Sequence, residues 1–192
     1  LSGSTSNNGY LNTFVYVLDQ EPFPNATVLG FTQNASTGAL TPAPGTVITT
    51  VAGKTVATGY SAGTTPSALA IDPSTRFVYV TDEAANQLYG YNIQTGGALL
   101  AMPNSPFVTG QFPVGVTVDP RCKFLYVANY TSGTIGAYAI DVASGTPVGS
   151  VGSISTLVGT GPTCISIEPA LGRYVYTSNS LDNTVSALRL NA

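Results

Sequence analysis

The sequence predicts an all-β protein, a β-propeller built from four-stranded antiparallel blades. A motif repeats along the chain, and its copies at Asp72 and Asp119 are 47 residues apart. The repeated segments are rich in Val, Ile, Tyr and Thr, are bounded by Gly, Pro, Asn and Asp, and show no helical period. Four short antiparallel strands in a period of this length are typical of a propeller blade. The 192 residues therefore form about four blades, as a partial arc or a small ring.

The first strand of each repeat is small and apolar and ends in an acidic residue followed by Pro. The three copies read SALAIDP, VGVTVDP and CISIEP. Such small side chains suit the crowded position beside a central channel. A carboxylate before Pro can accept hydrogen bonds within its turn, and a basic residue follows each copy a few positions later. We expect all six to be structural turn residues: Asp72, Asp119, Glu168, Arg76, Lys123 and Arg173.

The second strand of each repeat is apolar on both faces, as expected for a strand buried between neighbouring blades. It reads FVYV at Phe14 and again at Phe77, and then FLYV and YVYT. A polar turn follows, and the third strands of the last three repeats read LYGYNI, IGAYAI and VSALRL. A Gly-containing stretch then supplies a fourth, outer strand.

The chain is interpreted as a single propeller unit covering residues 1–192. Its approximate blades are 10–60, 65–111, 112–160 and 161–192. The first blade is irregular, and the alternating segment TVITTV predicts an extra hairpin or lengthened outer strands there. The last blade lacks a fourth strand, which residues 1–9 or another copy of the chain would supply.

These elements together resemble a known family. The combination of P-x-x-[ALIV]-x-[IV]-[DE]-P with a following [RK]-[FY]-[VL]-Y-[VT], and of strands ending [GA]-Y-x-I with elements such as TGALTPAPG, is similar to the YVTN-repeat β-propellers of the lactonase-like superfamily. The resemblance covers nearly all of residues 13–190. That superfamily includes cell-surface propellers and lactonases resembling bacterial 6-phosphogluconolactonases, which form closed seven-bladed rings. Family lactonases place acidic and basic residues, often with histidine, in a central cleft, and no position here matches such a set.

The charge composition excludes some classes of partner. Only 8% of the residues are charged, and six basic against nine acidic residues give a net charge of −3. Nucleic acid and anionic membrane surfaces are excluded because both require clustered basic residues, and no apolar run approaches the roughly 20 residues of a transmembrane helix. A surface rich in hydroxyls and amides predicts an extracellular or cell-surface location. Three sequons are candidates for N-glycosylation, at Asn25, Asn34 and Asn129.

Side chains that commonly carry chemistry are scarce. The chain has no histidine, which removes the usual catalytic triads and most zinc sites, and we expect neither a metal nor a cofactor. Cys122 and Cys164 either form one disulfide or remain two small apolar residues. The adjacent Asp82 and Glu83, in the turn DEAANQ, have no counterpart pair in the other repeats. This turn is the candidate polar site.

Three functions are compatible with these observations. Low charge, missing catalytic groups and an incomplete blade count favour a non-catalytic extracellular or cell-surface scaffold that self-associates into a ring or a filament. The alternative is a lactonase-like hydrolase of a sugar lactone, in which Glu83 or Asp141 activates water. Arg121 or Arg189 would then stabilise the developing negative charge. A further alternative is a carbohydrate-binding module with exposed tyrosines as stacking surfaces. Beside another copy of the chain, the expected partners are thus a carbohydrate or another surface protein. The scaffold is the preferred hypothesis, and the missing catalytic set argues against an enzyme.

Overall fold

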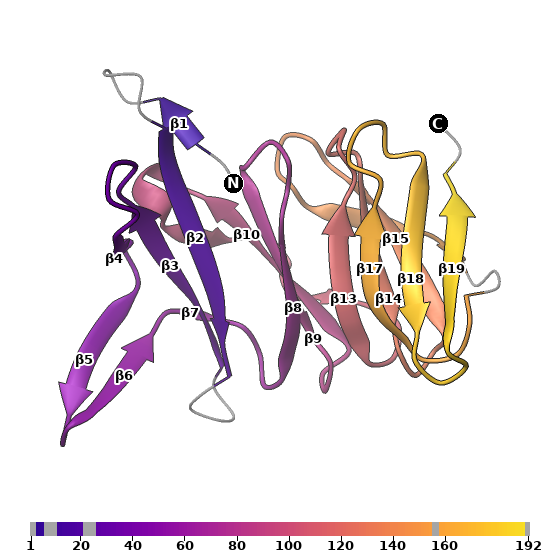
Figure 1. Cartoon of the computed structure of the whole chain (residues 1–192), viewed down its shortest axis with the longest axis horizontal. Helices are drawn as coiled ribbons and strands as arrows, with labels where there is room; N and C mark the ends of the chain where they lie inside the picture. The colour runs from indigo at the N-terminus through magenta and orange to yellow at the C-terminus, as the bar shows by residue number, and fades with distance from the viewer. Residues whose placement is uncertain (1–2, 6–10, 21–25, 155–157, 191–192) are drawn as a thin grey trace.

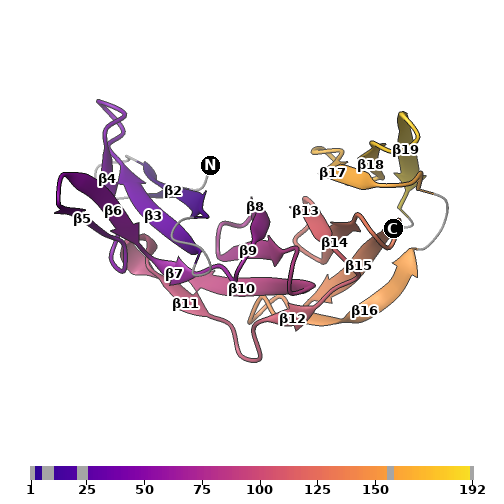
Figure 2. The ribbon, with the colours of Figure 1, turned by 90° about the horizontal axis from the view of Figure 1, so that it is seen from below.

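Four β-sheets stand next to one another in the computed structural model, which describes residues 3–5, 11–20, 26–154 and 158–190 (Figure 1). Seen from below, the four sheets form an arc that is open on one side (Figure 2). Neighbouring strands within each sheet are antiparallel. The structure thus confirms the predicted all-β fold with about four propeller blades.

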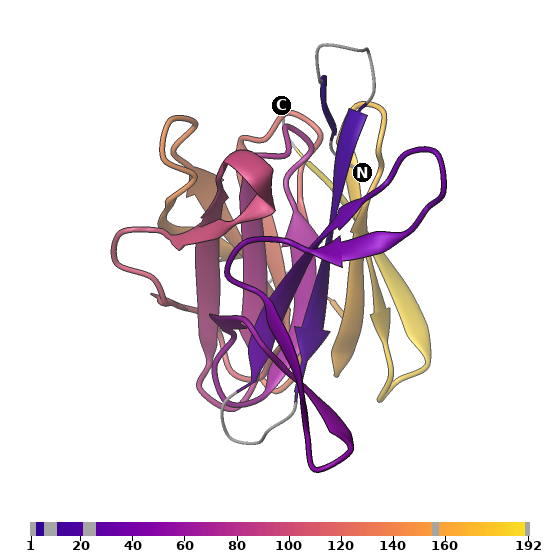
Figure 3. The same cartoon turned by 90° about the vertical axis from the view of Figure 1, so that its left-hand side faces the viewer.

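Blade 1 has the order β1-β2-β3-β4, and β7 also pairs with β3. Its strands are β1 (Gly3–Thr5), β2 (Leu11–Asp19), β3 (Thr27–Gln33), β4 (Leu40–Pro42) and β7 (Tyr60–Ser61). The predicted extra hairpin is present between β4 and β7, as β5 (Val47–Val51) paired with β6 (Lys54–Thr58). Figure 3 shows this hairpin projecting away from blade 1.

Blades 2 to 4 follow the sequence order from the inner to the outer strand. Blade 2 contains β8 (Pro66–Ile71), β9 (Phe77–Asp82), β10 (Gln87–Ile93), the short 3-10 helix η1 (Thr95–Gly97), β11 (Leu99–Ala101) and β12 (Phe107–Val108). Blade 3 contains β13 (Pro113–Val118), β14 (Phe124–Asn129), β15 (Thr134–Ile140) and β16 (Pro147–Ile154). Blade 4 contains β17 (Pro162–Ile167), β18 (Tyr174–Asn179) and β19 (Thr184–Arg189). The inner strands β8, β13 and β17 lie side by side along the concave side of the arc (Figure 2).

The hydrophobic cores lie between neighbouring blades. Each second strand points one row of side chains at the next blade and the other row at the previous one, because side chains alternate along a strand. Between blades 2 and 3, Tyr79 of β9 packs in one cluster with Leu125 and Val127 of β14. The junctions of blades 1 with 2 and of blades 3 with 4 repeat this arrangement of an aromatic face against an aliphatic face. The apolar second strands predicted from the sequence therefore hold the arc together.

Buried tyrosine hydroxyls tie successive blades together. The Tyr16 hydroxyl donates a hydrogen bond to the Gly97 carbonyl of blade 2 (2.9 Å), and the Tyr79 hydroxyl donates to the Gly145 carbonyl of blade 3 (2.6 Å). Both acceptor glycines have positive φ angles, +86° and +77°, which favour glycine in these turns. Burial raises the pKa of both phenols, so they remain protonated donors at ordinary pH.

The arc is uncovered at both ends among the described residues. Tyr174 and Tyr176 of β18 are 40% and 41% exposed, whereas their counterparts in β9, Phe77 and Tyr79, are buried. Val17 of β2 is also exposed, on the other face of blade 1. An aromatic blade face and an aliphatic blade face, the two partners of every internal junction, thus remain uncovered.

The structure corrects the prediction for the N-terminal segment. Residues 3–5 pair with residues 11–13 of β2 in blade 1, and not with β19 of blade 4. The rest of residues 1–9 lies outside the described residues. Within this chain, the described part of the segment therefore extends the first blade instead of completing the last.

Candidate functional site

The second strands of all four blades end on one face of the arc, which we call the crossover face. It comprises the turns after the second strands and the segments that lead into the inner strands, at residues 63–65, 83–86, 109–112, 130–133, 159–161 and 180–183. Figure 2 looks onto this face. The inner strands end at the opposite face, where the acid-Pro turns lie.

Asp82, one of the two residues of the predicted polar site, connects two backbone segments of the crossover face through its carboxylate. Its buried carboxylate accepts hydrogen bonds from the backbone amides of Thr64 (2.8 Å) and Thr65 (3.2 Å), which lead into β8. It also accepts from the amides of Ala84 and Ala85 in the turn that follows. These contacts join the end of β9 to the start of β8. A carboxylate engaged in this way is committed to holding the backbone and not to chemistry.

Glu83, the other half of that pair, has a different environment. It is partly buried, and its carboxylate accepts no hydrogen bond from the residues that the structure describes. Burial and the adjacent Asp82 raise the pKa of Glu83 above its ordinary 4.5. Asn86, in the same turn, accepts a hydrogen bond from the Phe112 amide through its side chain (2.7 Å) and so links this turn to the next crossover.

Charge is divided between the two faces. Beside Asp82 and Glu83, the crossover face carries Asp19 and Asp182, while Lys54 lies on the β5–β6 hairpin. The other five basic residues lie at the ends of strands on the opposite face: Arg76, Arg121, Lys123, Arg173 and Arg189. The crossover face is consequently acidic within the part of the chain that the structure describes.

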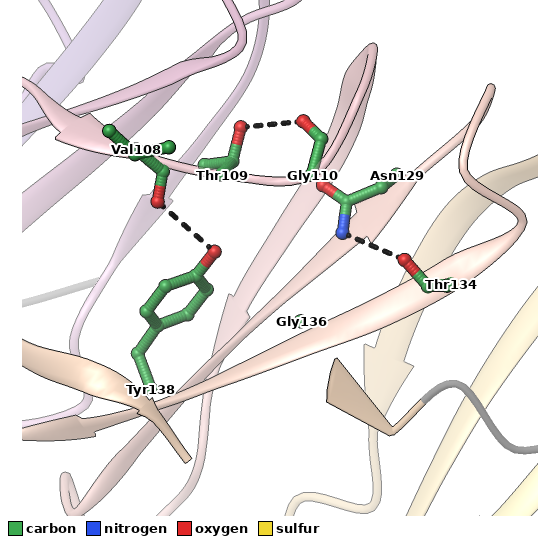
Figure 4. Close-up of a pocket in the computed structure, with 7 residues that line it drawn as sticks. All are labelled: Val108, Thr109, Gly110, Asn129, Thr134, Gly136 and Tyr138. Atoms are coloured by element: carbon green, nitrogen blue, oxygen red, sulfur yellow. Dashed lines mark hydrogen bonds between the residues drawn. The ribbon is translucent and has the colours of Figure 1, made fainter. Parts of the chain in front are cut away.

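A pocket opens on the crossover face between blades 2 and 3. It has a volume of about 390 Å³ and is lined by Val108, Thr109, Gly110, Asn129, Thr134, Gly136 and Tyr138. Figure 4 shows the 108–110 crossover on one side and residues of β14 and β15 on the other. No charged side chain is among these seven residues. The lining offers hydroxyls, an amide, backbone carbonyls and one aromatic ring.

Asn129 is the polar group of the pocket with unused hydrogen-bonding capacity. It is 1% exposed, and its side-chain oxygen has no partner in the structure. The amide nitrogen donates only long hydrogen bonds, to the Thr134 hydroxyl (3.3 Å) and the Val127 carbonyl (3.5 Å). Exchanging the oxygen and nitrogen positions would leave the nitrogen poorly paired instead. The side-chain oxygen of Asn179, the equivalent residue of blade 4, is also buried without a partner, so the two amides differ in the hydrogen bonds of the nitrogen.

Of the hydrolytic groups proposed from the sequence, Glu83 is not brought together with either arginine. Asp141 follows β15 on the opposite face from Glu83, where its carboxylate accepts hydrogen bonds from the Ala143 and Ser144 amides. Hydrogen bonds from the Ser144 amide and hydroxyl lower the pKa of Asp141. Arg121 is paired with Asp119 on that opposite face (3.0 Å). The idea that Glu83 acts together with Arg121 or Arg189 is therefore wrong, because the length of a blade separates them.

The six predicted turn residues lie at the opposite face. The Asp72 carboxylate accepts from the amides of Arg76 and Phe77 (both 2.7 Å). The equivalent carboxylates accept from backbone amides too, Asp119 from Lys123 and Glu168 from Ala170, Leu171 and Arg173. Their contacts are those of turn caps.

The sequons and cysteines occupy different environments. Asn129 is too buried to carry a glycan in the folded protein, which corrects the prediction at that sequon. Asn34 is exposed and caps its own turn by accepting from the amides of Ser36 and Thr37, and Asn25 lies outside the described residues. Cys122 and Cys164 are free thiols, one buried and one exposed.

No helix among the described residues is long and apolar enough to cross a membrane. No group of three or more His, Cys, Asp and Glu side chains there is placed to hold a metal ion.

A family model covers most of the chain. The model described as "Lactonase, 7-bladed beta-propeller" matches residues 12–167. The chain belongs to this lactonase family of propellers. The resemblance inferred from the repeated motifs is thereby confirmed. No curated protein sequence matches the chain.

Solved structures similar to this lactonase-family chain share its fold at low identity. A Bacteroides fragilis protein assigned as a 6-phosphogluconolactonase superposes with a TM-score of 0.65 at 17% identity, covering 99% of this chain and 54% of its own. The periplasmic gluconolactonase PpgL of Pseudomonas aeruginosa gives 0.54 at 17% identity, covering 99% and 66%. Hydrazine synthase of Kuenenia stuttgartiensis gives 0.62 at 16% identity, covering 96% and 57%. The chain thus spans between about half and two thirds of the length of these structures.

Sequence reasoning missed the pocket beside Asn129. The sequence predicts Asn129 only as a candidate glycan acceptor and assigns no role to Gly136 or Tyr138. The available signal was Gly136 itself, which interrupts a third strand where the aligned repeats have Tyr89 and Ser186. A glycine inside a strand commonly marks a place where another group approaches closely.

Proposed function

We propose that this chain forms part of a lactone-hydrolysing propeller whose substrate is a neutral sugar lactone. The observation that carries the proposal is the match of the lactonase family model to residues 12–167. It supports the hydrolase over the non-catalytic scaffold that the composition favoured. The gluconolactonase and the protein assigned as a 6-phosphogluconolactonase, both similar in fold, act as precedents for the substrate class.

The preference for a neutral lactone rests on charge. Asp19, Asp82, Glu83 and Asp182 lie on the crossover face, and the arginines lie at the other end of the strands. An acidic face repels a phosphorylated substrate and offers its phosphate no guanidinium partner. A neutral lactone meets no such barrier.

Glu83 is the residue of the crossover face best suited to act as a general base. Its carboxylate is not engaged by the described residues, and its raised pKa makes it a stronger base than an ordinary surface carboxylate. In the proposed step it takes a proton from water while the water oxygen bonds to the lactone carbonyl carbon. The ester bond to the ring oxygen then breaks, and that oxygen takes up the proton to give the open-chain acid.

Titration of released acid tests this function. Glucono-1,5-lactone should be hydrolysed faster with the protein than in buffer, and faster than its 6-phosphate. Glu83→Gln should remove the acceleration, whereas Asp141→Asn, which changes a carboxylate on the opposite face, should retain it. Hydrolysis by the wild type at the rate of the buffer blank would refute the proposal.

A second candidate function, association with further blades, is favoured by the uncovered ends of the arc. Tyr176 is exposed where the equivalent Tyr79 is buried against blade 3 and donates to a carbonyl of that blade. The aliphatic face carrying Val17 is the type of surface that covers such a tyrosine at each internal junction. We propose head-to-tail docking of these two faces between copies. Self-association and an extracellular or cell-surface location otherwise stay predictions.

Sedimentation velocity tests the second candidate. The wild type should form dimers or larger species as its concentration rises, and Tyr176→Asp should remain monomeric. Leu181→Asp, at an exposed turn residue away from that strand face, is the matched control. A wild type that stays monomeric at high concentration would exclude docking between copies.

A further inference from the structure

The third strands of blades 2, 3 and 4 carry different residues at one repeated position. Tyr89, Gly136 and Ser186 each pair with the fourth residue of the preceding strand in their own blade. Each therefore lies at the same place, close to the polar residue that ends the second strand. What fills that place differs from blade to blade.

In blade 2 the place is filled by the ring of Tyr89. A Cβ atom added to Gly63, in the crossover, would lie 3.0 Å from Cε2 of this ring and would also contact the Asp82 carboxylate. The aromatic ring and the crossover backbone therefore enclose Asp82. Blade 2 is closed at this point.

In blade 4 the place is filled by a hydroxyl group. The amide nitrogen of Asn179 donates to Ser186 Oγ (2.9 Å) and to the Thr184 hydroxyl (3.0 Å). Ser186 Oγ also accepts a hydrogen bond from the Gly159 amide (3.2 Å). The side chain thus links the strand end to the crossover.

In blade 3 no side chain stands at this place, because Gly136 has none, and the ring of Tyr138 approaches it: an added Cβ atom would lie 3.1 Å from Tyr138 Cε2. The crossover amides of blade 3 do not donate to the residue that ends the second strand. The Gln111 amide donates to Ser132 Oγ (2.8 Å) and the Phe112 amide to Asn86 Oδ1 (2.7 Å). In blade 2 the equivalent amides, of Thr64 and Thr65, bind the strand-end carboxylate. Blade 3 has instead the 390 Å³ pocket and an Asn129 amide nitrogen that makes only long hydrogen bonds.

The pocket has the properties of a small-molecule site. Its volume falls within the roughly 300–1,000 Å³ of typical ligand pockets and exceeds the roughly 30 Å³ share of one water molecule. A ligand hydroxyl can supply what Ser186 supplies in blade 4, a partner for the strand-end amide. The Thr109 and Thr134 hydroxyls add two further hydrogen-bonding groups.

We propose that this pocket, between blades 2 and 3 beside Gly136, binds a neutral hydroxylated six-membered ring such as a pyranose. Tyr138, which is 6% exposed, contributes a small apolar part of the pocket lining, and its hydroxyl donates a hydrogen bond to the Val108 carbonyl (3.3 Å) (Figure 4). A charged ligand is disfavoured because no lining residue is ionic and the surrounding face is acidic. The site goes beyond the proposed hydrolysis, since Glu83 is not among its lining residues and binding requires no catalytic group.

Amide chemical shifts of the wild-type protein test the site directly. Methyl β-D-glucopyranoside, which cannot be hydrolysed as a lactone, should shift the amide signals of Gly110, Gly136 and Tyr138. The signals of Gly159 and Ser186, at the closed equivalent in blade 4, should not move. Sodium glucuronate, of similar shape but negatively charged, should cause smaller changes.

Two variants separate binding from folding. Gly136→Ser places in blade 3 the side chain that closes blade 4, and the affinity for the glucoside should fall about tenfold or more, as expected when one good hydrogen-bonding position is lost. Ser186→Ala is the matched control and should leave the affinity unchanged.

The outcome that overturns the site is an unresponsive pocket. If the glucoside shifts none of the signals at the pocket, the site holds water only and the proposal is wrong. Unchanged binding in a folded Gly136→Ser variant would also overturn it. Neither result bears on lactone hydrolysis, which is measured separately through Glu83.

Discussion

Blades 2 and 3 share a sequence motif and a strand order, but they use the end of the second strand in different ways. In blade 2 the buried carboxylate of Asp82 accepts four backbone amides and the ring of Tyr89 lies beside it. In blade 3 Asn129 makes only long hydrogen bonds, and Gly136 leaves a pocket next to it. The same repeated position is therefore structural in blade 2 and lies beside a pocket in blade 3.

The largest difference between the two blades is expected on removal of the strand-end side chain. Asp82→Ala should lower the free energy of unfolding by about 3–5 kcal/mol, because several buried amides lose a charged acceptor together. Asn129→Ala should lower it by about 1 kcal/mol or less, since few good hydrogen bonds are lost. Urea unfolding of both variants measures this, and equal losses would remove the distinction between the blades.

The tyrosines that face the next blade offer a second comparison. Tyr79→Phe should lower the free energy of unfolding by about 1–1.5 kcal/mol, because it leaves the buried Gly145 carbonyl without its donor. Tyr176→Phe, at the exposed equivalent in blade 4, should change it by less than about 0.5 kcal/mol. Both variants are compared at low protein concentration, where the chain is monomeric and the face that carries Tyr176 is uncovered. A large effect at Tyr176 would mean that this face is already covered there.

A third comparison concerns the closed position in blade 4. Ser186→Ala should lower the free energy of unfolding by about 1 kcal/mol, since the Asn179 amide and the Gly159 amide lose a shared partner. Thermal or urea unfolding detects a change of this size. An unaltered free energy would indicate that water replaces the hydroxyl in blade 4 without loss.

The smallest effect is expected at Glu83. Its pKa is raised in the folded protein, so the folded state holds the proton more tightly than the unfolded state. The stability it contributes is present below the unfolded pKa and is lost as the pH rises through the raised folded value. Glu83→Gln should therefore gain up to about 0.5 kcal/mol relative to the wild type above that pH. Unfolding free energies of both proteins, measured from pH 4 to pH 8, test this difference. A gain limited to acidic pH would contradict a raised pKa for Glu83.

Much of this architecture could be predicted from the sequence, because blade-building residues repeat. The acid-Pro turns, the FVYV-type strands and the hairpin at TVITTV all depend on local pattern, and the structure contains each of them. The candidate site was harder to predict. Asp82 was prominent in the sequence because it is charged, yet its charge is fully engaged by nearby backbone amides.

The pocket depends on what is missing from one repeat. Asn129 and Gly136 are ordinary residues in sequence, and their significance comes from the register that places Gly136 where Tyr89 and Ser186 fill the other blades. Glu83 and Arg121 lie on opposite faces of the arc because one follows a second strand and the other precedes one. The spacing of the motifs alone did not reveal this.

The unfolding free energies of Gly136→Ser and Ser186→Ala, compared in the same urea titration without ligand, show most directly whether blade 3 has room for the hydroxyl that blade 4 carries. If blade 3 lacks the hydroxyl that closes blade 4, Gly136→Ser should raise the free energy by about 0.5–1 kcal/mol, through a partner for Asn129 and lower chain entropy in the unfolded state. The Cε2 atom of Tyr138 lies 3.1 Å and its hydroxyl oxygen 3.2 Å from the added Cβ, and both must shift slightly for this gain to appear. A loss in Gly136→Ser equal to that in Ser186→Ala would contradict the account, because the space beside Asn129 would then not be open.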